Sequence, residues 1–207
     1  MMRQRVVSAA DVYGRYDIPA SVTVEIDTRE QRPLLFPKTI RIEHPELANS
    51  VIPIGVATRS IVLDAGDYRL KEFPNCCIVE RKASPEEIWI NLHDPKDSVR
   101  QARAFRRLAA CQYPVLLVEA SPSEMFRQNA VVKYPDLGVH RLAVVAAKYG
   151  LQMIWMPWRH RTPDTRRQLG EFLVHLMVAY AIQRKLDILP ELLDTEKICD
   201  TIEVSRG

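Results

Sequence analysis

The chain has 207 residues, 47% of them hydrophobic and 27% charged, a balance ordinary for one globular domain with a small appendage. Its longest apolar stretch, Phe172 to Ile182, is interrupted by His175 and is shorter than the ~20 residues of a membrane span, so no membrane partner is expected. The net charge of +3 permits nucleic-acid binding without arguing for it, and the four cysteines lack zinc-site spacing, which favours reduced thiols in an intracellular protein.

The first part of the chain predicts strands separated by polar loops. Residues 1–20 carry arginines but no apolar core with a cleavage site, so we interpret them as an N-terminal extension and not as a secretion signal. Val22–Ile26 predicts a short strand, and the polar loop Asp27–Pro33 follows it. Pro45–Thr58 mixes proline, asparagine, serine and glycine and is expected to be irregular, ahead of the β-rich segment Ser60–Asp64.

A strand and a helix start follow each other closely in the middle of the chain. Cys77–Lys82 predicts a strand whose apolar half changes abruptly to charge. Ser84 then suits the N-cap, Pro85 the first helical position and Glu87 the third, which is the pattern of a capping box. A helix is therefore expected directly after the charged end of this strand.

The second half of the chain alternates helices and strands. Helices are expected over Ser98–Cys111, Leu137–Tyr149 and Thr165–Leu186, and strands over Val115–Val118 and Leu151–Trp155. The continuous apolar run of Val115–Val118 is typical of a strand covered on both faces. The alternation predicts an α/β fold, in which a central mixed β-sheet, parallel in part, is flanked by helices.

Two of these helices carry clear apolar faces. The face expected to be buried on the helix over Ser98–Cys111 consists of Val99, Ala102, Phe105, Leu108 and Ala109. The last helix has a broader apolar surface, which includes Leu169, Phe172, Leu173, Leu176 and Tyr180. Residues 161–207 are therefore expected to form a C-terminal helix and tail that pack on the rest of the chain or on a homodimer or heteromer partner.

Asp67, Glu80 and Lys82 are the residues that indicate chemistry. Side chains alternate along a strand, so Glu80 and Lys82 share one face and Arg81 points away. A hairpin would bring Asp67 beside Glu80, and two converging carboxylates repel each other unless a cation lies between them. Oxygen ligands without cysteine or histidine suit Mg²⁺ or Mn²⁺, which could activate water for phosphodiester cleavage. A turn aspartate and a cross-strand ion pair would give the same pattern.

Two motifs resemble those of a known family. Gly66–Tyr68 and Val79–Lys82 resemble the G-D-x(n)-E-R-K motif of the XPF-type nucleases, a branch of the restriction-endonuclease-like PD-(D/E)XK fold. Ile26–Glu30 is similar to the family's D-x-R-E, and Tyr113–Glu119 to its Y-x-x-P-V-L-L-I-E strand. Gln101 lies where a helix glutamine follows the motif. The resemblance implies a restriction-endonuclease-like core, with residues 21–160 as the nuclease domain.

The resemblance also implies a role for each matching residue. Mg²⁺ or Mn²⁺ would be bound by Asp67, Glu80, Asp27 and the backbone carbonyl of Arg81, while Lys82 would handle the attacking water and Glu30 would add acidity. Contacts to DNA are expected from Arg29, Arg81, Lys96, Arg100 and Gln101. Family substrates are branched, flapped or forked DNA, and hydrolysis is expected to leave a 5′-phosphate and a 3′-hydroxyl.

The chain departs from the family pattern in three ways that bear on these residue roles. Where the family has an aspartate after E-R-K, this chain has Glu86 followed by Glu87, and either could support the site. Where the family often has arginine before the helix glutamine, the chain has Asp97, for which Lys96 or Arg100 would have to substitute. No tandem helix-hairpin-helix domain is expected after Pro163, so the chain resembles the compact stand-alone versions of phage and prophage genomes.

Three functions fit these observations. The first is a Mg²⁺- or Mn²⁺-dependent endodeoxyribonuclease of DNA repair, recombination or replication, in the cytoplasm or nucleoid, or in the host cytoplasm if a phage encodes it. The second is a non-catalytic DNA-binding or scaffolding subunit on a nuclease fold, and the third is a nuclease active only with a partner on the last helix. The segment Trp155–Arg161 interleaves aromatic and basic residues and either stacks on a nucleic-acid strand or packs at a strand end.

Overall fold

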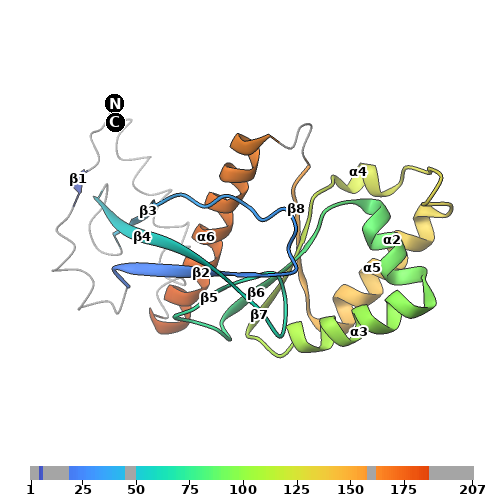
Figure 1. Ribbon diagram of the computed structural model, residues 1–207, viewed down its shortest axis with the longest axis horizontal. Helices are drawn as coiled ribbons and strands as arrows, with labels where there is room; N and C mark the ends of the chain where they lie inside the picture. Colours follow the sequence, from blue (N-terminus) through green and yellow to red (C-terminus); the bar gives the residue numbers. More distant parts are fainter. Residues whose placement is uncertain (1–4, 7–18, 45–49, 158–161, 187–207) are drawn as a thin grey trace, which may run out of the picture.

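The computed structural model describes residues 5–6, 19–44, 50–157 and 162–186, and one sheet runs through them (Figure 1). Its strand order is β1-β4-β2-β5-β6-β7-β8, with β3 paired to β4. The strands are β1 Arg5–Val6, β2 Ser21–Asp27, β3 Thr39–Glu43, β4 Ser50–Ile61, β5 Tyr68–Leu70, β6 Cys77–Lys82, β7 Tyr113–Val118 and β8 Gln152–Trp155. The helices are α2 Pro85–His93, α3 Pro95–Leu108, α4 Pro122–Met125, α5 Pro135–Tyr149 and α6 Pro163–Leu186.

The sheet is mixed, as the alternation of elements predicts. β6, β7 and β8 run parallel to one another, while the short β5 is antiparallel to both of its neighbours, β2 and β6. The helices lie in two groups, with α6 apart from α2, α3 and α5 (Figure 1). The expected α/β fold, a central mixed sheet flanked by helices, is therefore confirmed.

Strand alternation divides the interior into two hydrophobic cores. Along β6, Cys77 and Val79 belong to the core that α6 covers, while Ile78 belongs to the core of α2, α3 and α5. β7 is buried on both faces, as its continuous apolar sequence predicts. Because neighbouring residues of β6 face different cores, the charged end of the same strand also projects toward two different environments.

The last helix docks on the sheet of its own chain. Five of its apolar side chains belong to the core that also contains Cys77 and Val79: Leu169, Leu173, Val174, Met177 and Val178. Ala181 is buried as well. Each large aliphatic side chain buried in this way contributes about 1.5–3 kcal/mol. Tyr180 stacks on Tyr113 with ring centroids 4.3 Å apart, whereas Phe172, expected on the same apolar surface, is 42% exposed. Packing on a homodimer or heteromer partner, the other expectation for this helix, stays a prediction.

The expectation of an irregular Pro45–Thr58 segment is wrong for residues 50–58. They belong to β4, which pairs with β3 through its first half and with β2 through its second half. The His44 N–H donates to the Ser50 carbonyl, and the Val56 N–H donates to the Lys38 carbonyl. Because hydrogen-bonded pairs alternate along an antiparallel ladder, the nitrogen of Pro53 points away from β3, so no hydrogen bond to β3 is lost there. β3 has no counterpart among the strands expected from the sequence, and residues 45–49 lie outside the described part of the chain.

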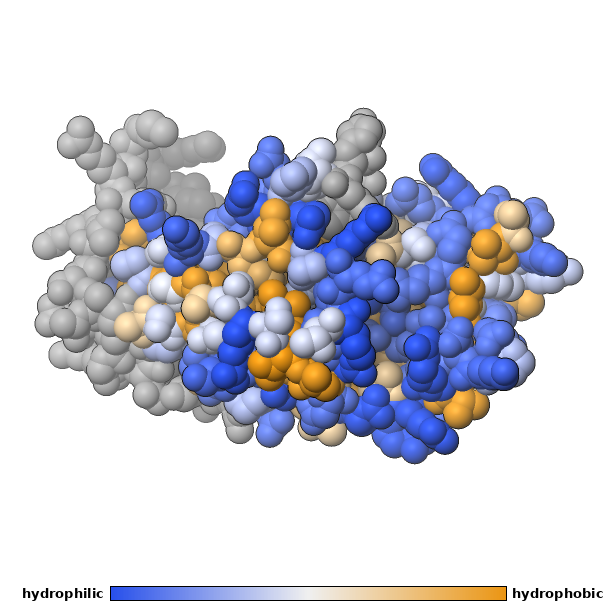
Figure 2. Space-filling view, viewed as in Figure 1, coloured by the Kyte–Doolittle hydropathy of each residue, from blue (hydrophilic) through white to orange (hydrophobic). Residues whose placement is uncertain are grey.

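Local sequence signals predict the helix ends correctly, but they predict the buried face of α3 only in part. Ser84 caps α2 by accepting from the Glu87 N–H, and Gly150 ends α5 with a φ of 63°. On α3 the expected apolar face is rotated, because Val99 is 54% exposed and Gln101 is buried in its place. The face shown in Figure 2 is mostly hydrophilic, with scattered apolar patches and no single broad one.

Candidate active site

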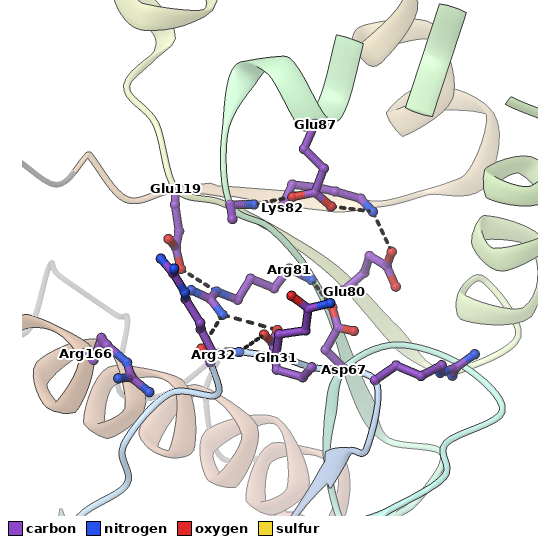
Figure 3. A pocket seen from close by; sticks show the side chains of 12 residues that line it. Gln31, Arg32, Asp67, Glu80, Arg81, Lys82, Glu87, Glu119 and Arg166 are labelled. Carbon is purple, nitrogen blue, oxygen red and sulfur yellow. Dashed lines mark hydrogen bonds and ion pairs between the residues drawn. The ribbon is translucent and has the colours of Figure 1, made fainter. Parts of the chain in front are cut away.

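A polar cavity of about 690 Å³ opens at the ends of β6 and β7, beside the start of β5 (Figure 3). Most of its lining residues are charged: Arg29, Glu30, Gln31, Arg32, Asp67, Glu80, Arg81, Lys82, Ala83, Glu87, Glu119 and Arg166. These residues come from the loop after β2, from the turn before β5, and from β6, α2, α6 and the end of β7. Many residues that the sequence singled out therefore meet in one place, although they are far apart along the chain.

The turn before β5 fixes the position of Asp67. Gly66 has a φ of +67°, and a Cβ there would lie 2.9 Å from the Val79 carbonyl oxygen, so a side chain does not fit. The Asp67 N–H donates to that carbonyl (2.7 Å), and its Oδ2 accepts from the Arg81 N–H (2.7 Å). β5 and β6 form an antiparallel pair. Asp67 thus lies beside the charged end of β6, where Glu80 projects into the same cavity.

The Asp67 and Glu80 carboxylates repel each other in a way that a bound cation would relieve. Burial, followed by the charge of Glu80, raises the pKa of Asp67 to about 7. In a strand the N–H and C=O of one residue point to the same side, so the Arg81 carbonyl faces Asp67, as its N–H does. Two carboxylates and one carbonyl oxygen are ligands that Mg²⁺ or Mn²⁺ prefers. Within the described residues no three His, Cys, Asp or Glu side chains form a metal cluster, so the remaining ligands would be backbone or water oxygens.

Lys82 is held beside the carboxylates by three oxygen atoms. Its Nζ lies 2.8 Å from Glu80 Oε1, 3.4 Å from Glu87 Oε1 and 3.1 Å from Gln101 Oε1. Burial by itself would lower the pKa of Lys82, but Glu80 and Glu87 outweigh it and keep this pKa above its usual value. Lys82 is therefore an ammonium ion at neutral pH, able to donate hydrogen bonds but not to accept a proton.

Gln101 supports the site from α3. Its side-chain oxygen accepts from Lys82, and its Nε2 donates to Glu80 Oε1 (3.2 Å). The residue is buried, which accounts for the rotation of the α3 face toward the cavity. The structure places Gln101 where it orients Lys82 and Glu80, and the expected contact of its amide with DNA does not fit this position.

The structure distinguishes between Glu86 and Glu87. Glu87 lines the cavity, and its Oε2 accepts from the Ala83 N–H (2.8 Å) while its Oε1 faces Lys82. Glu86 lies in the same helical turn but accepts from Asn129 Nδ2 (2.7 Å), away from the cavity. Glu87 is thus both part of the helix cap and part of the site.

Arg81 points to the opposite face of the sheet from Glu80 and Lys82, as strand alternation predicts. Its guanidinium pairs with Glu119 and Glu30 (3.2 Å) and donates to the Arg32 carbonyl (2.8 Å). The residue is 8% exposed. This guanidinium is buried and holds the loop after β2 against the end of β7, so the geometry does not favour the expected DNA contact through the Arg81 side chain, which stays a prediction.

Glu119 lines the site, although its match to the last position of the family's strand motif predicted no role for it. It directly follows β7, and its N–H donates to the Lys82 carbonyl (2.9 Å). A signal was present, because Glu119 is the first charged residue after the apolar run of β7. Its partner Arg81 is far away in sequence, so the pairing itself depends on the parallel register of β6 and β7.

Asp27 and Arg29 pair with each other beside the cavity. Asp27 is buried and accepts from Arg29 Nε (2.8 Å), the Arg29 N–H (2.7 Å) and the Leu63 N–H (3.0 Å). The Arg29 side-chain bond, against the opposing effect of burial, lowers the pKa of Asp27. Asp27 does not line the cavity, so the geometry does not favour the expected metal-ligand role. Arg29 does line it, and its side chain remains 66% exposed.

Other expected DNA contacts lie elsewhere. Lys96 is in the first turn of α3, and Arg100 pairs on the helix surface with Asp97 (2.8 Å). Neither lines the cavity. Trp155 packs against the core of α2, α3 and α5, while residues 158–161 lie outside the described part of the chain, which leaves a stacking role for Trp155–Arg161 untested. None of the described helices is both long and apolar enough to cross a membrane.

Comparisons with known proteins give a distant structural likeness. No protein-family model and no curated protein matches the chain. Among solved structures, XPF from Aeropyrum pernix is 21% identical, with a TM-score of 0.48 over 74% of this chain and 60% of that chain. XPF from the same organism in complex with DNA is 18% identical, with a TM-score of 0.48 over 80% of this chain and 67% of that chain. This chain thus spans less than two thirds of the first of these structures, and its function is inferred from its own site.

Proposed function

We propose that this protein is a metal-dependent DNA endonuclease that hydrolyses phosphodiester bonds. The observation that carries the proposal is the meeting of Asp67, Glu80 and Lys82 in one charged cavity. Two carboxylates that repel each other destabilise the fold. A bound cation would remove this cost, and carboxylate oxygens are suitable ligands for one. A fixed ammonium ion beside a bound cation completes an arrangement suited to a phosphate ester.

The proposed cofactor is Mg²⁺ or Mn²⁺. Asp67 and Glu80 would hold it through carboxylate oxygens, and Arg81 through its backbone carbonyl, with waters completing the coordination. Bound there, the ion would polarise a phosphoryl oxygen and lower the pKa of a coordinated water. Asp27 is left out of this ligand set, because Arg29 and the Leu63 N–H already bind its carboxylate.

Lys82 is proposed to orient the attacking water and to offset negative charge on the phosphate. Its ammonium group is held in place by Glu80, Glu87 and Gln101, so little reorganisation is needed when a substrate binds. We assign Gln101 a positioning role, since it contacts both Lys82 and Glu80. Glu87 has a similar role toward Lys82 from the first turn of α2.

DNA with branches, flaps or forks is the proposed substrate, with a 5′-phosphate and a 3′-hydroxyl as products. The support is the motif resemblance of Gly66–Tyr68 and Val79–Lys82, which these residues carry in the same order and with the same spacing. The cavity is consistent with a phosphate backbone as ligand, because its lining is charged and offers no apolar pocket for a base. Action on DNA implies an intracellular location, which we propose with it.

The two alternative functions have weaker support. A non-catalytic scaffold would gain nothing from a carboxylate pair that raises the pKa of Asp67 and opposes folding. A nuclease that depends on a partner was suggested by the apolar surface of the last helix, but much of that surface packs on the sheet of the same chain. The endonuclease therefore accounts for more of the structure than either alternative does.

The first experiment is cleavage of labelled flap, fork, four-way and plain duplex DNA with Mg²⁺ or Mn²⁺. We expect the wild type to cut at least one substrate and Asp67→Ala to lose on the order of 10³-fold in rate, the size of effect that loss of transition-state charge stabilisation produces. Asp64→Ala is the matched control, because Asp64 precedes the same turn but is exposed, and among the described residues its carboxylate pairs with Arg69 alone.

The possible results separate the three functions. Cutting that is lost in Asp67→Ala but kept in Asp64→Ala, with both variants folded, supports the endonuclease and its site. DNA binding without any cutting by the wild type, under conditions where metal binding is verified, favours the scaffold. Cutting that appears only after a second protein is added favours the partner-dependent nuclease.

A further inference from the structure

Part of the cavity is lined by arginines that the proposed hydrolysis does not use. Figure 3 shows Arg32 and Arg166 on the side away from Asp67. Arg32 belongs to the loop after β2, and Arg166 to the first turns of α6. Both arginines line the same cavity, where an anionic ligand would reduce the repulsion between their positive charges.

The carboxylates closest to these arginines already have a partner. Glu30 and Glu119 both pair with the buried guanidinium of Arg81, which lies between them. Arg32 is exposed, and among the described residues no acidic side chain forms an ion pair with it. With Arg81, Arg32 and Arg166 facing only Glu30 and Glu119 among the described acidic residues, one positive charge is left without a carboxylate at this end of the cavity.

Arg166 carries a hydrogen-bond donor that lacks an acceptor. Its Nη2 donates to the Pro33 carbonyl, but its Nε is buried and has no hydrogen-bond partner among the described residues. A buried donor without an acceptor costs about 1–3 kcal/mol, a cost that an acceptor supplied by a ligand of Arg166 would remove.

The helical turn that carries Arg166 is also held in a fixed place. The Leu35 N–H donates to the Arg166 carbonyl (3.4 Å), and a Cβ on Gly170 would overlap the Leu35 carbonyl oxygen. α6 is thus seated directly on the backbone of the loop that carries Arg32. The two guanidinium groups are presented by elements that are fastened to each other, which is a preorganised arrangement for one shared ligand.

We propose that Arg32 and Arg166 together bind a phosphate of the substrate strand next to the phosphate that is cut. This proposal rests on the proposed nuclease function, which places the cut at Asp67 and Glu80 in the same cavity. A phosphate is the ligand of choice because it is anionic, offers several acceptor oxygens to planar guanidinium forks, and recurs along a nucleic-acid strand. The contact would position the strand without reading its sequence.

The test measures the salt dependence of DNA binding by the full chain, with Ca²⁺ in place of Mg²⁺ to prevent cutting. Arg32→Ala, Arg166→Ala and the double variant are compared with the wild type on one labelled duplex. Each lost phosphate contact lowers the slope of log affinity against log salt by about 0.9. The ratio of the affinity at ~50 mM salt to the affinity at ~200 mM salt is then about 3.5-fold smaller for the variant than for the wild type. Because both arginines bind the same phosphate, the slope of the double variant is expected to fall by the amount for one phosphate contact and not by the amount for two.

Arg167→Ala is the matched control. Arg167 is next to Arg166 on α6 but is exposed and pairs with Asp164 (3.2 Å), so its loss is expected to leave the slope unchanged. Urea unfolding checks the fold of each variant, and the exposed Arg32→Ala decides the question if Arg166→Ala does not fold. An Arg32→Ala slope equal to that of the wild type would overturn the proposal.

Cleavage by the same proteins with Mg²⁺ separates this proposal from the proposed function. We expect Arg32→Ala to raise KM while kcat stays within about twofold, as for an interaction made equally in the ground and transition states. A wild type that cuts, with slope and KM unaffected by the arginine variants, rejects the phosphate site alone. A lowered slope in the variants of a protein that never cuts rejects the nuclease and keeps the phosphate site.

Discussion

Two ionic networks start from neighbouring residues of β6 and differ in almost every physical respect. On one face of the strand, Arg81 is buried and forms ion pairs with both Glu30 and Glu119. On the other face, Glu80 and Lys82 join Asp67 in an arrangement with an excess of carboxylate. The first network has a guanidinium at its centre. The second has its negative charges around an opening to solvent.

This difference shows how a single run of charged residues serves two purposes. The closed network joins the loop after β2 to the end of β7, and it would lose stability if any member were removed. The open network lowers stability by itself, because burial and Glu80 disfavour ionised Asp67. Charged groups that oppose folding are typical of functional sites. Variants in each network should therefore affect different measurable quantities.

The largest expected effect is on activity, in the open network. Glu80→Gln keeps the shape of the side chain but removes a charge that would bind the metal, so we expect a loss of cleavage rate on the order of 10³-fold. Single-turnover cleavage at saturating DNA measures this loss. Glu171→Gln, an exposed position on α6, serves as the control. Comparable rates for Glu80→Gln and the wild type would refute the assignment of Glu80.

The next effect is on stability, in the closed network. Glu119→Ala leaves the Arg81 guanidinium buried with a missing partner, which is expected to cost about 3–5 kcal/mol in the free energy of unfolding. Urea unfolding monitored by circular dichroism measures this change. If the loss is under about 1 kcal/mol, the Arg81–Glu119 pair does not hold the structure together as we describe.

A smaller effect of opposite sign is expected at Asp67. The folded-state pKa of Asp67 is raised to about 7, so ionising it opposes folding. This cost is absent below the unfolded pKa near 4, grows as pH rises, and is fully present above about 7. In EDTA, Asp67→Asn should therefore stabilise the protein by ~1–2 kcal/mol at pH 8 and by nothing at pH 3.5, allowing for partial exposure. A destabilised variant at pH 8 would contradict this.

The smallest effect is expected outside both networks. Arg100 lies on the surface of α3, and within the described part of the chain its one ion pair is with Asp97. Exposed pairs of this kind contribute about 0–1 kcal/mol. Arg100→Ala should leave unfolding free energy and DNA affinity nearly unchanged, as measured by urea unfolding and fluorescence anisotropy. A marked loss of affinity would restore the DNA contact that the motif resemblance implies and the geometry does not support.

Local rules were sufficient for much of this site. The two-residue period of a strand placed Glu80 and Lys82 on one face and Arg81 on the other. The Gly66-Asp67 turn and the antiparallel β5–β6 pair brought Asp67 to the end of β6, as expected. Ser84 and Gly150 marked helix ends correctly. These features depend on backbone geometry over a few residues, which the sequence displays directly.

Features that depend on several elements at once were not predictable in this way. β4 was missed because its proline and glycine are tolerated only through the particular register with β3 and β2. Val99, expected to be buried, is exposed, and Gln101 is buried. The reason is that Gln101 forms hydrogen bonds with Lys82 and Glu80 of β6. The geometry does not favour Asp27 as a metal ligand, because its carboxylate already accepts hydrogen bonds from the Arg29 side chain and the Leu63 N–H.

The sequence by itself determined the mixed α/β architecture, the placement of Asp67, Glu80 and Lys82, and the expectation of a cation between carboxylates. Those conclusions follow from periodicity, turn chemistry and ligand preference, which act over short stretches of chain. Only the tertiary structure decided that Glu87 and not Glu86 faces the site, that Glu119 completes the Arg81 network, and that Arg166 joins Arg32. These pairings are made by packing between distant elements, where the alternatives differ in space and look alike in sequence.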